Sequence, residues 1–479
     1  MTSEMTPPRT ESAQTPQTAE TAQTAQSAQT PQAAVPRSAV VVGAGYTGLV
    51  AALRLAQAGS SVTVLERGDV VGGLASDFTV EGASLERAYH HLFKTDEDII
   101  ALAGELGVGE QLRWHDSSVA IYYEGRLHPF ATPLDLLRFS PLKPWNRLRA
   151  GLVVLYLQKT RAWTRFQRVT AYAWMRRAGG AEVLKVIWEP LLRGKFDQYY
   201  DEVAMAWLWA RIHIRANSKA PGDSGEKLGY FDGGFQTFTD ALVDAAQAAG
   251  VKIRTGVDIA AITAAPGGGA SVRMADGTAE QADAVVATVP SSVFARLAGE
   301  DLRALPGGAD YARRLEAIDY LGARLMIFSS DQDLSPYYWH NVNDVDLPFL
   351  VFINHTKLVG TAPYGGRHVY YLATYVPHEH ELFTCTEDEL ADRWFEALRQ
   401  VVPSFDRERV RERHTFAFAN AQHIVDTEYA EKRPEHRTPL PGVHLCNFSQ
   451  IYPEDRGTNY AVRDGQRIAD VVLGRTAER

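Results

Sequence analysis

The chain has 479 residues, 45% hydrophobic and 22% charged, which is typical of a globular protein with two or more domains. Its net charge of −9 argues against a nucleic-acid partner, and its two cysteines, Cys385 and Cys446, have neither metal-site nor disulfide-framework spacing, so we expect no metal. No apolar stretch reaches the roughly 20 residues that span a bilayer, and a reducing cytoplasm is the simplest compartment.

Residues 1–36 consist mainly of Thr, Ala, Gln and Pro, with the near-repeat TAETAQTAQSAQTPQ. They lack the apolar core of a signal peptide and cannot bury enough surface to offset the entropy lost on ordering. The sequence therefore predicts a disordered tail at 1–36. We interpret it as a passive extension, with a functional role as the alternative.

A strand–turn–helix–strand unit follows. Residues 40–42 predict a buried strand, apolar residues spaced by three and four over 49–56 predict a helix, and residues 62–65 predict a second strand. The turn and helix start contain the expected cofactor contacts Gly43, Gly45, Tyr46, Thr47 and Gly48. A lone GxGxxG is a weak signal, but between a strand and a helix it predicts a dinucleotide site.

Each part of this motif has a physical role. Gly43 permits the tight turn, Gly45 lets a pyrophosphate approach the backbone, and Gly48 allows the helix to pack closely. The helix N-terminus offers free N–H groups to the phosphates. Glu66 follows the second strand, where a carboxylate accepts hydrogen bonds from ribose hydroxyls.

The residues after Glu66 indicate which dinucleotide binds. The pattern E-R-x-x-x-x-G-G resembles the second signature of the flavin amine oxidase superfamily, which also includes protoporphyrinogen oxidases, phytoene desaturases and UDP-galactopyranose mutases. The resemblance implies that FAD is the cofactor and that this segment contacts it through Glu66, Arg67, Gly72, Gly73, Leu74 and Ala75. The alternative is that the glycine pair is a plain surface turn.

A second segment resembles the superfamily's next FAD-binding block. It comprises a glycine turn at 233–234, an amphipathic helix, a strand at 251–253 and a buried strand at 284–289. In relatives, the residue matching Val257 holds adenine through its backbone.

A third segment, 442–473, resembles the C-terminal flavin block, with a strand, a glycine turn and a helix at 466–473 whose N-terminus points at the flavin. The resemblance implies flavin contacts from Arg456, Gly457, Asn459, Tyr460, Ala461 and Val462. We expect backbone N–H groups near Ala461 and Val462 to face the ring. Arg456 either stabilises the charge of the reduced flavin or only forms a salt bridge that braces the loop.

The three blocks predict an α/β fold with a discontinuous Rossmann-type FAD-binding domain. This domain comprises 37–94, 226–290 and 442–479. The intervening residues, 95–225 and 291–441, are expected to form a substrate domain with a mixed sheet and a helical cap.

Two features bear on the substrate side. Residues 89–96 resemble the H-x-F-x-T stretch of UDP-galactopyranose mutases, in which the histidine matching His91 lies against the flavin. His91 is thus a candidate to hydrogen-bond the ring or move a proton, or else it is merely packed. Arg193, Lys195 and Arg211 resemble cap residues of protoporphyrinogen-oxidase-like proteins and are candidate substrate contacts, or else surface or structural charges.

Residues 133–177 contain ten basic residues and one acidic residue, interleaved with Leu, Val, Tyr, Trp and Phe. The first interpretation is a helical cap with an apolar core stripe and solvated charges. A basic amphipathic surface of this kind also contacts anionic membranes, and it can receive an anionic substrate. Peripheral contact with the inner membrane face through 133–177 is therefore an open alternative to a purely cytoplasmic protein.

The resemblance implies an FAD-dependent oxidoreductase in which a hydride passes from a small organic substrate to the flavin. A UDP-galactopyranose mutase-like enzyme, without net redox change, is the alternative. A non-catalytic flavin-binding protein is a third. The sequence leaves the oligomeric state open.

Overall fold

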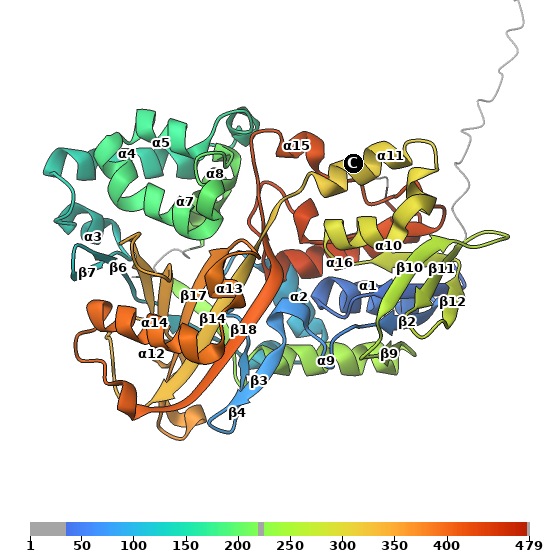
Figure 1. Ribbon diagram of the computed structural model, residues 1–479, viewed down its shortest axis with the longest axis horizontal. Coiled ribbons are helices and arrows are strands. Elements are labelled where there is room, and N and C mark those ends of the chain that lie inside the picture. The colour runs from blue at the N-terminus through green and yellow to red at the C-terminus, as the bar shows by residue number, and fades with distance from the viewer. Residues whose placement is uncertain (1–34, 219–224, 477–479) are drawn as a thin grey trace, which may run out of the picture. The chain divides into compact units, whose positions relative to one another are not determined.

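The computed structural model describes residues 35–218 and 225–476 (Figure 1), so all but the end of the predicted tail lies outside the described residues. A five-stranded parallel sheet has the order β19-β13-β1-β2-β9. Its strands are β1 (Ser38–Val42), β2 (Ser61–Leu65), β9 (Lys252–Arg254), β13 (Ala284–Ala287) and β19 (Val443–Leu445). They come from all three predicted segments, which confirms the Rossmann-type fold class.

Alternate side chains of β1 point to opposite faces of the sheet and pack into two different hydrophobic cores, because side chains alternate with a two-residue period along a strand. Ala39 and Val41 pack with the helices of one face, and Val40 and Val42 pack with those of the other. The first face is covered by α1 (Tyr46–Gln57), α9 (Phe235–Ala248) and α16 (Thr458–Val472). The second is covered by α10 (Ser291–Arg303), α11 (Gly308–Glu316) and an antiparallel sheet of β10 (Ile259–Ala264), β11 (Ala270–Met274) and β12 (Ala279–Ala282).

A seven-stranded mixed sheet forms the second layer system, in the order β18-β14-β17-β16-β15-β6-β7. Its strands are β6 (Val119–Tyr123), β7 (Arg126–Pro129), β14 (Tyr320–Ser330), β15 (Trp339–Val342), β16 (Val351–Asn354), β17 (His368–Val376) and β18 (Val410–His423). Helix α14 (Glu387–Val401) shares a core with this sheet. Two small sheets pair β3 (Asp77–Val80) with β4 (Ala83–Glu86) and β5 (Leu112–Asp116) with β8 (Lys227–Phe231).

The helical cap lies above the mixed sheet in Figure 1 and contains α3 (Pro133–Arg138), α4 (Pro144–Lys159), α5 (Ala171–Ala178), α6 (Ala181–Val183), α7 (Glu189–Phe196) and α8 (Met205–Asn217). The remaining helices are α2 (Glu97–Glu105), α12 (Thr356–Val359), α13 (Glu381–Thr384) and α15 (Tyr429–Lys432). The described residues, 35–218 and 225–476, pack as one unit, so the boundary between FAD and substrate domains stays a prediction.

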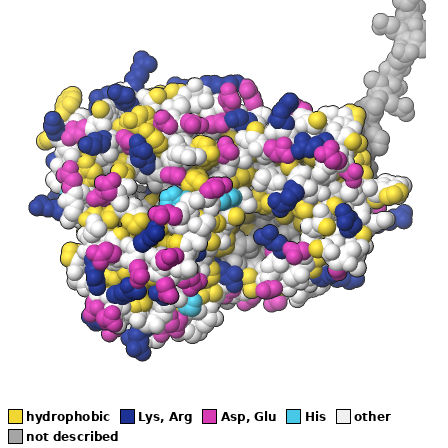
Figure 2. Space-filling model, viewed as in Figure 1, with side chains coloured by type: hydrophobic (Ala, Val, Ile, Leu, Met, Phe, Trp, Pro, Cys, Tyr) yellow, Lys and Arg dark blue, Asp and Glu magenta, His cyan; other side chains and the backbone are white. Residues whose placement is uncertain are grey.

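Among the described residues, no helix has both the length and the apolar character needed to cross a bilayer. Acidic and basic side chains are interspersed over much of the face in Figure 2. Over the cap, at the upper left, apolar and basic side chains lie side by side.

The last helix corrects one prediction. Helix α16 begins at Thr458 and not near residue 466. Gly465, which directly precedes the helix expected at 466–473, lies inside α16, where a Cβ atom would be 2.7 Å from the Thr47 backbone oxygen and 2.8 Å from the Val50 Cβ. A glycine at this position lets α16 pack directly against α1.

Candidate functional site

Two glycines of the first motif are required by the protein's own packing. Gly43 has a φ of +107°, which favours glycine, and its N–H donates to the Leu65 carbonyl at 2.8 Å. At Gly48, a Cβ atom would lie 2.0 Å from the Gly43 carbonyl oxygen. The motif therefore closes a tight turn between β1 and the first turn of α1.

Gly45 differs from the other two, because its φ of −72° suits any residue and the nearest atom to an added Cβ is the Gly73 Cα, at 3.8 Å. Protein contacts alone do not explain this glycine. It caps α1 and leaves space beside free helix N–H groups, which fits a dinucleotide pyrophosphate.

The second glycine pair is built into the same site. The Gly72 N–H donates to the Ala44 carbonyl at 2.8 Å, and an added Cβ on Gly73 would lie 3.1 Å from the Gly45 Cα. Both glycines have positive φ, and the short helical turn that follows contains Leu74 and Ala75. The glycine pair thus packs on the pyrophosphate loop, whereas a plain surface turn would not need this contact.

The adenosine end of the proposed cofactor site is formed by Glu66. Its carboxylate accepts hydrogen bonds from the N–H groups of Ala44 and Gly68, both at 2.7 Å, and its carbonyl accepts from the Val257 N–H at 2.8 Å. An ionised carboxylate has further acceptor positions for ribose hydroxyls. Arg67 is exposed, and its contact with FAD stays a prediction.

At the flavin end, α16 begins after its cap, Gly457. The Ala461 N–H already donates to the Gly457 carbonyl at 3.0 Å, so it is not a free donor, and the flavin contacts expected near Ala461 and Val462 stay predictions. The free groups of the first turn belong to Thr458, Asn459 and Tyr460.

The side chain of Asn459 has a structural partner, since its Oδ1 accepts from the Ile99 N–H at 3.0 Å and thereby fixes the start of α2. The Tyr460 ring lies under the Arg463 guanidinium at 4.8 Å. Their contacts with the flavin stay predictions.

A buried charged cluster, here called the cationic cluster, adjoins this helix start. Lys195 and Arg211, which the sequence proposed as substrate contacts, both pair with Asp455, at 2.7 Å and 3.2 Å. Arg456 follows in the chain and donates from Nη2 to the Tyr375 hydroxyl at 2.8 Å and from Nε to the Ala421 carbonyl. Two cations thus pair with one carboxylate, and the charge of a third, Arg456, lies close to it. The Arg456 side chain donates to Tyr375 and Ala421, whereas the structural alternative required a salt bridge to Asp455 or Glu454.

The electrostatics of the cationic cluster favour negative charge. Burial lowers the pKa of Lys195, and Asp455 opposes this effect. Burial also raises the pKa of Asp455, but Lys195, Arg456 and Arg211 outweigh it and hold that pKa well below its usual range. In the same way, Arg456 and Lys195 outweigh burial at Tyr375 and bring the pKa of its hydroxyl below the ordinary value.

An aromatic wall with His91 adjoins the cationic cluster. Tyr89 interacts electrostatically with Tyr375, and its ring lies 5.1 Å from that of Trp339. His91 Nδ1 lies 3.2 Å from the Tyr338 hydroxyl, and its ring is 5.9 Å from that of Trp339. Burial, followed by the charge of Arg215, lowers the pKa of His91 to about 3, so its imidazole is neutral at physiological pH.

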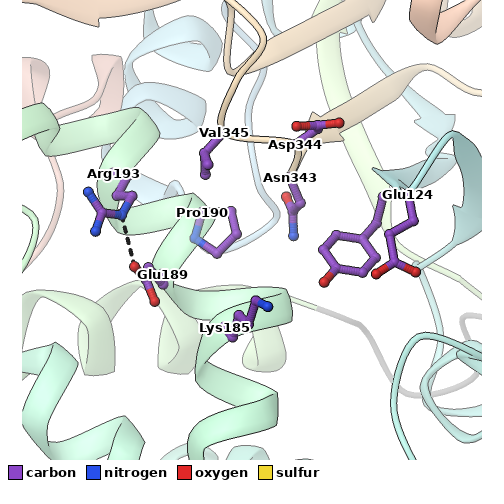
Figure 3. A pocket seen from close by; sticks show the side chains of 9 residues that line it. Glu124, Lys185, Glu189, Pro190, Arg193, Asn343, Asp344 and Val345 are labelled. Carbon is purple, nitrogen blue, oxygen red and sulfur yellow. Dashed lines mark hydrogen bonds and ion pairs between the residues drawn. The ribbon is translucent and has the colours of Figure 1, made fainter.

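Arg193, the third candidate substrate contact, lies apart from the cationic cluster. Its Nε pairs with Glu189 at 2.9 Å, and its guanidinium lies 3.7 Å from the Tyr200 ring centre. It lines a separate pocket of about 370 Å³, shown in Figure 3, with Glu124 on the opposite side. None of the expected FAD contacts lines this pocket.

Sequence reasoning missed a fully buried carboxylate. Glu86, at the end of β4, accepts from the Phe235 N–H at 2.6 Å and from the Tyr230 hydroxyl at 2.8 Å. Burial raises its pKa to about 7, although these hydrogen bonds favour the charged form. Sequence reasoning also missed Tyr375, because only tertiary contacts bring this tyrosine to Arg456.

Comparisons with known proteins agree with this architecture. The family model described as flavin containing amine oxidoreductase matches residues 46–473. Putrescine oxidase of Kocuria rosea is 32% identical over 30% of this chain and 32% of its own length. A 15-cis-phytoene desaturase of Solanum lycopersicum is 25% identical over 59% of this chain and 51% of its own length, so the chain spans a third to a half of these two relatives.

Solved structures share the fold at lower identity. A putative protoporphyrinogen oxidase from Exiguobacterium sp. 255-15 superposes with a TM-score of 0.72 at 19% identity, covering 91% of this chain and 98% of that one. A reduced UDP-galactopyranose mutase gives 0.71 at 15% identity, covering 92% and 94%. At such identities the likeness shows the fold alone. The mutase alternative is not favoured, because the family model and the sequence relatives named above are oxidoreductases.

Proposed function

Because this chain belongs to the family of flavin containing amine oxidoreductases, with FAD as its cofactor, we propose that it oxidises an uncharged or anionic organic substrate by hydride transfer. The observation that carries the substrate class is the cationic cluster, in which Lys195 and Arg211 pair with the single carboxylate of Asp455 and the charge of Arg456 lies close to it.

The excess positive charge of the cationic cluster disfavours the binding of an alkylammonium substrate beside it. Three cations and one carboxylate leave an excess of two positive charges. Two like charges about 5 Å apart repel by about 3 kcal/mol at an effective dielectric of 20. An ammonium group would be disfavoured there, whereas a carboxylate, a phosphate or a neutral hydroxyl would be accepted.

FAD supplies a two-electron acceptor when it is bound. The residues of this chain provide the surroundings for that chemistry. The free N–H groups of α16 and the Arg456 guanidinium offset negative charge that develops near the helix start. The rings of Tyr89 and Trp339 exclude water from the substrate side, and the neutral His91 imidazole can donate or accept a hydrogen bond without adding charge.

The test is anaerobic stopped-flow reduction of the purified flavoprotein. The substrates form a panel that shares one carbon skeleton with an oxidisable alcohol, and each compound carries an ammonium, a second hydroxyl or a carboxylate at its other end. We expect the hydroxyl and carboxylate compounds to bleach the flavin and the ammonium compound to leave it oxidised. Fast bleaching by ammonium compounds at a pH where they are protonated would overturn the proposed substrate class.

A matched pair of variants links this result to the cationic cluster. Lys195→Met should raise KM for an anionic substrate, because it removes a buried cation. Lys185→Met, which removes a lysine from the separate pocket of Figure 3, should leave KM unchanged. Equal effects of both substitutions would show that the cluster does not select the substrate.

A further inference from the structure

Large apolar side chains are exposed together on one edge of the cap. Trp145 and Leu152 on α4 are 76% and 68% exposed, and the set on α3 and α4 comprises Leu134, Leu137, Trp145, Leu148, Leu152, Leu155 and Tyr156. Elsewhere in the described ranges, large apolar side chains are exposed only at Val35, Val70 and Val345. We call the exposed α3–α4 set the apolar face. Scattered exposed apolar residues are ordinary, but a contiguous set indicates an interaction site.

Helix α4 carries two apolar stripes. Ala150, Val153 and Leu157 are buried in the protein, as expected for a cap helix. Trp145, Leu148 and Leu152 recur at the same three- and four-residue spacing on a different side and point outward. The first interpretation of this segment, a helical cap with an apolar core stripe and solvated charges, accounts for the buried stripe but not for the exposed apolar one.

The apolar face is also a groove. Helix α3 meets α4 at Gly151, where an added Cβ would lie 3.8 Å from Leu136 Cδ2. The groove beside this contact has a volume of about 620 Å³ and is lined mainly by apolar side chains, including those of Leu137, Trp145 and Leu148. Its shape gives apolar chains a place to insert between the two helices.

Exposed basic side chains flank the apolar face at both ends of α4. Arg138 and Lys143 lie at its start, and Lys159 and Arg161 lie at its end. The single acidic residue of this segment, Asp135, is occupied in a capping box, where it accepts from the Thr132 N–H at 2.8 Å. The surroundings of the apolar face are thus strongly positive in a chain whose net charge is −9.

We propose that α3 and α4 dock this protein on the surface of an anionic lipid bilayer. An interfacial helix places its apolar side chains at the acyl boundary, keeps basic side chains at the headgroups, and often includes tryptophan. A second copy of this chain is a poorer occupant, because a two-fold contact would set the same basic residues against each other. Docking of this kind is independent of the chemistry proposed above and requires no membrane-spanning helix.

The test is co-sedimentation of the full-length flavoprotein with vesicles of phosphatidylcholine, with or without phosphatidylglycerol. We expect binding to the anionic vesicles and release as salt rises, because screening shortens from about 10 Å at 0.1 M to about 3 Å at 1 M. Replacing Lys143 and Lys159 by Gln should weaken partitioning about 30-fold, since each basic residue contributes about 1 kcal/mol. Lys252→Gln, an exposed lysine on β9, is the matched control and should bind normally.

A second pair of variants tests the apolar contribution. Trp145→Ser with Leu152→Ser should abolish vesicle binding, whereas Val345→Ser, at an exposed apolar residue outside the cap, should not. FAD content reports folding in each variant. Equal binding to neutral and anionic vesicles, no binding by the unchanged protein, or full binding by the double serine variant would overturn the proposal. So would a dimer that the double variant converts to a monomer, because the apolar face would then be a self-association interface.

Discussion

Substitutions in the pyrophosphate loop can distinguish glycines that folding requires from a glycine that FAD binding requires. An alanine Cβ at Gly45 would have one neighbour, the Gly73 Cα at 3.8 Å, which is ordinary van der Waals contact. The φ of −72° at Gly45 is also suitable for alanine. We therefore expect Gly45→Ala to fold without FAD as stably as the unchanged chain, or about 0.4–1 kcal/mol more stably, because alanine reduces the entropy of the unfolded chain.

In contrast to its effect on stability, Gly45→Ala should weaken FAD binding. The added methyl group would occupy space assigned to the pyrophosphate, and overpacking of this kind costs about 1–3 kcal/mol. The affinity for FAD should fall about 5- to 150-fold. At an FAD concentration 100 times the original Kd, stabilisation of the unchanged protein is about 2.7 kcal/mol, and a 50-fold loss of affinity would reduce it to about 0.6 kcal/mol.

Gly48→Ala is the contrasting variant, because its Cβ would lie 2.0 Å from the Gly43 carbonyl oxygen. The clash is with a backbone carbonyl, which can move only if the turn itself is distorted. This change should therefore lower the free energy of unfolding by about 3 kcal/mol or more, with or without FAD. The assay is urea unfolding at several FAD concentrations, with FAD titration by flavin fluorescence. Unchanged FAD affinity in Gly45→Ala, or wild-type stability in Gly48→Ala, would refute the assigned geometry.

Three further predictions concern buried charges. Arg456→Gln should lower the flavin reduction potential by roughly 30 mV with FAD content retained, measured by dye-coupled reduction; an unchanged potential with reduced thermal stability would make this arginine structural. Asp455→Asn should destabilise the protein by about 3–5 kcal/mol in urea unfolding, because Lys195 loses its buried partner, and a loss below 1 kcal/mol would contradict the pairing. Burial raises the pKa of Glu86 from 4.5 to about 7, so the folded protein favours the protonated carboxyl group. The free energy of unfolding therefore falls as pH rises from about 4.5 through about 7 and Glu86 ionises. Glu86→Gln should therefore gain about 2–3 kcal/mol relative to the unchanged protein between pH 5 and pH 8, and a pH-independent difference would contradict the burial argument.

The sequence by itself determined the cofactor end of this protein. The first strand, the glycine turn and α1 are neighbours in the chain, so their spacing predicts their geometry directly. Glu66 and the Gly72–Gly73 pair follow within a few residues of β2. Short-range sterics decide such a unit, because Gly43 and Gly48 are fixed by contacts with each other and with adjacent strands.

Only the tertiary structure decided the cationic cluster and the exposed apolar face of the cap. Lys195, Tyr375 and Asp455 lie on three separate parts of the chain, and no local pattern predicts that they meet. The first residue of α16 could not be predicted from the sequence for a related reason. Glycine is common in turns, and only the close packing of Gly465 against α1 explains why a glycine lies inside this helix. The helical period likewise predicts that α4 is amphipathic, but which of its apolar stripes is buried depends on the helices around it.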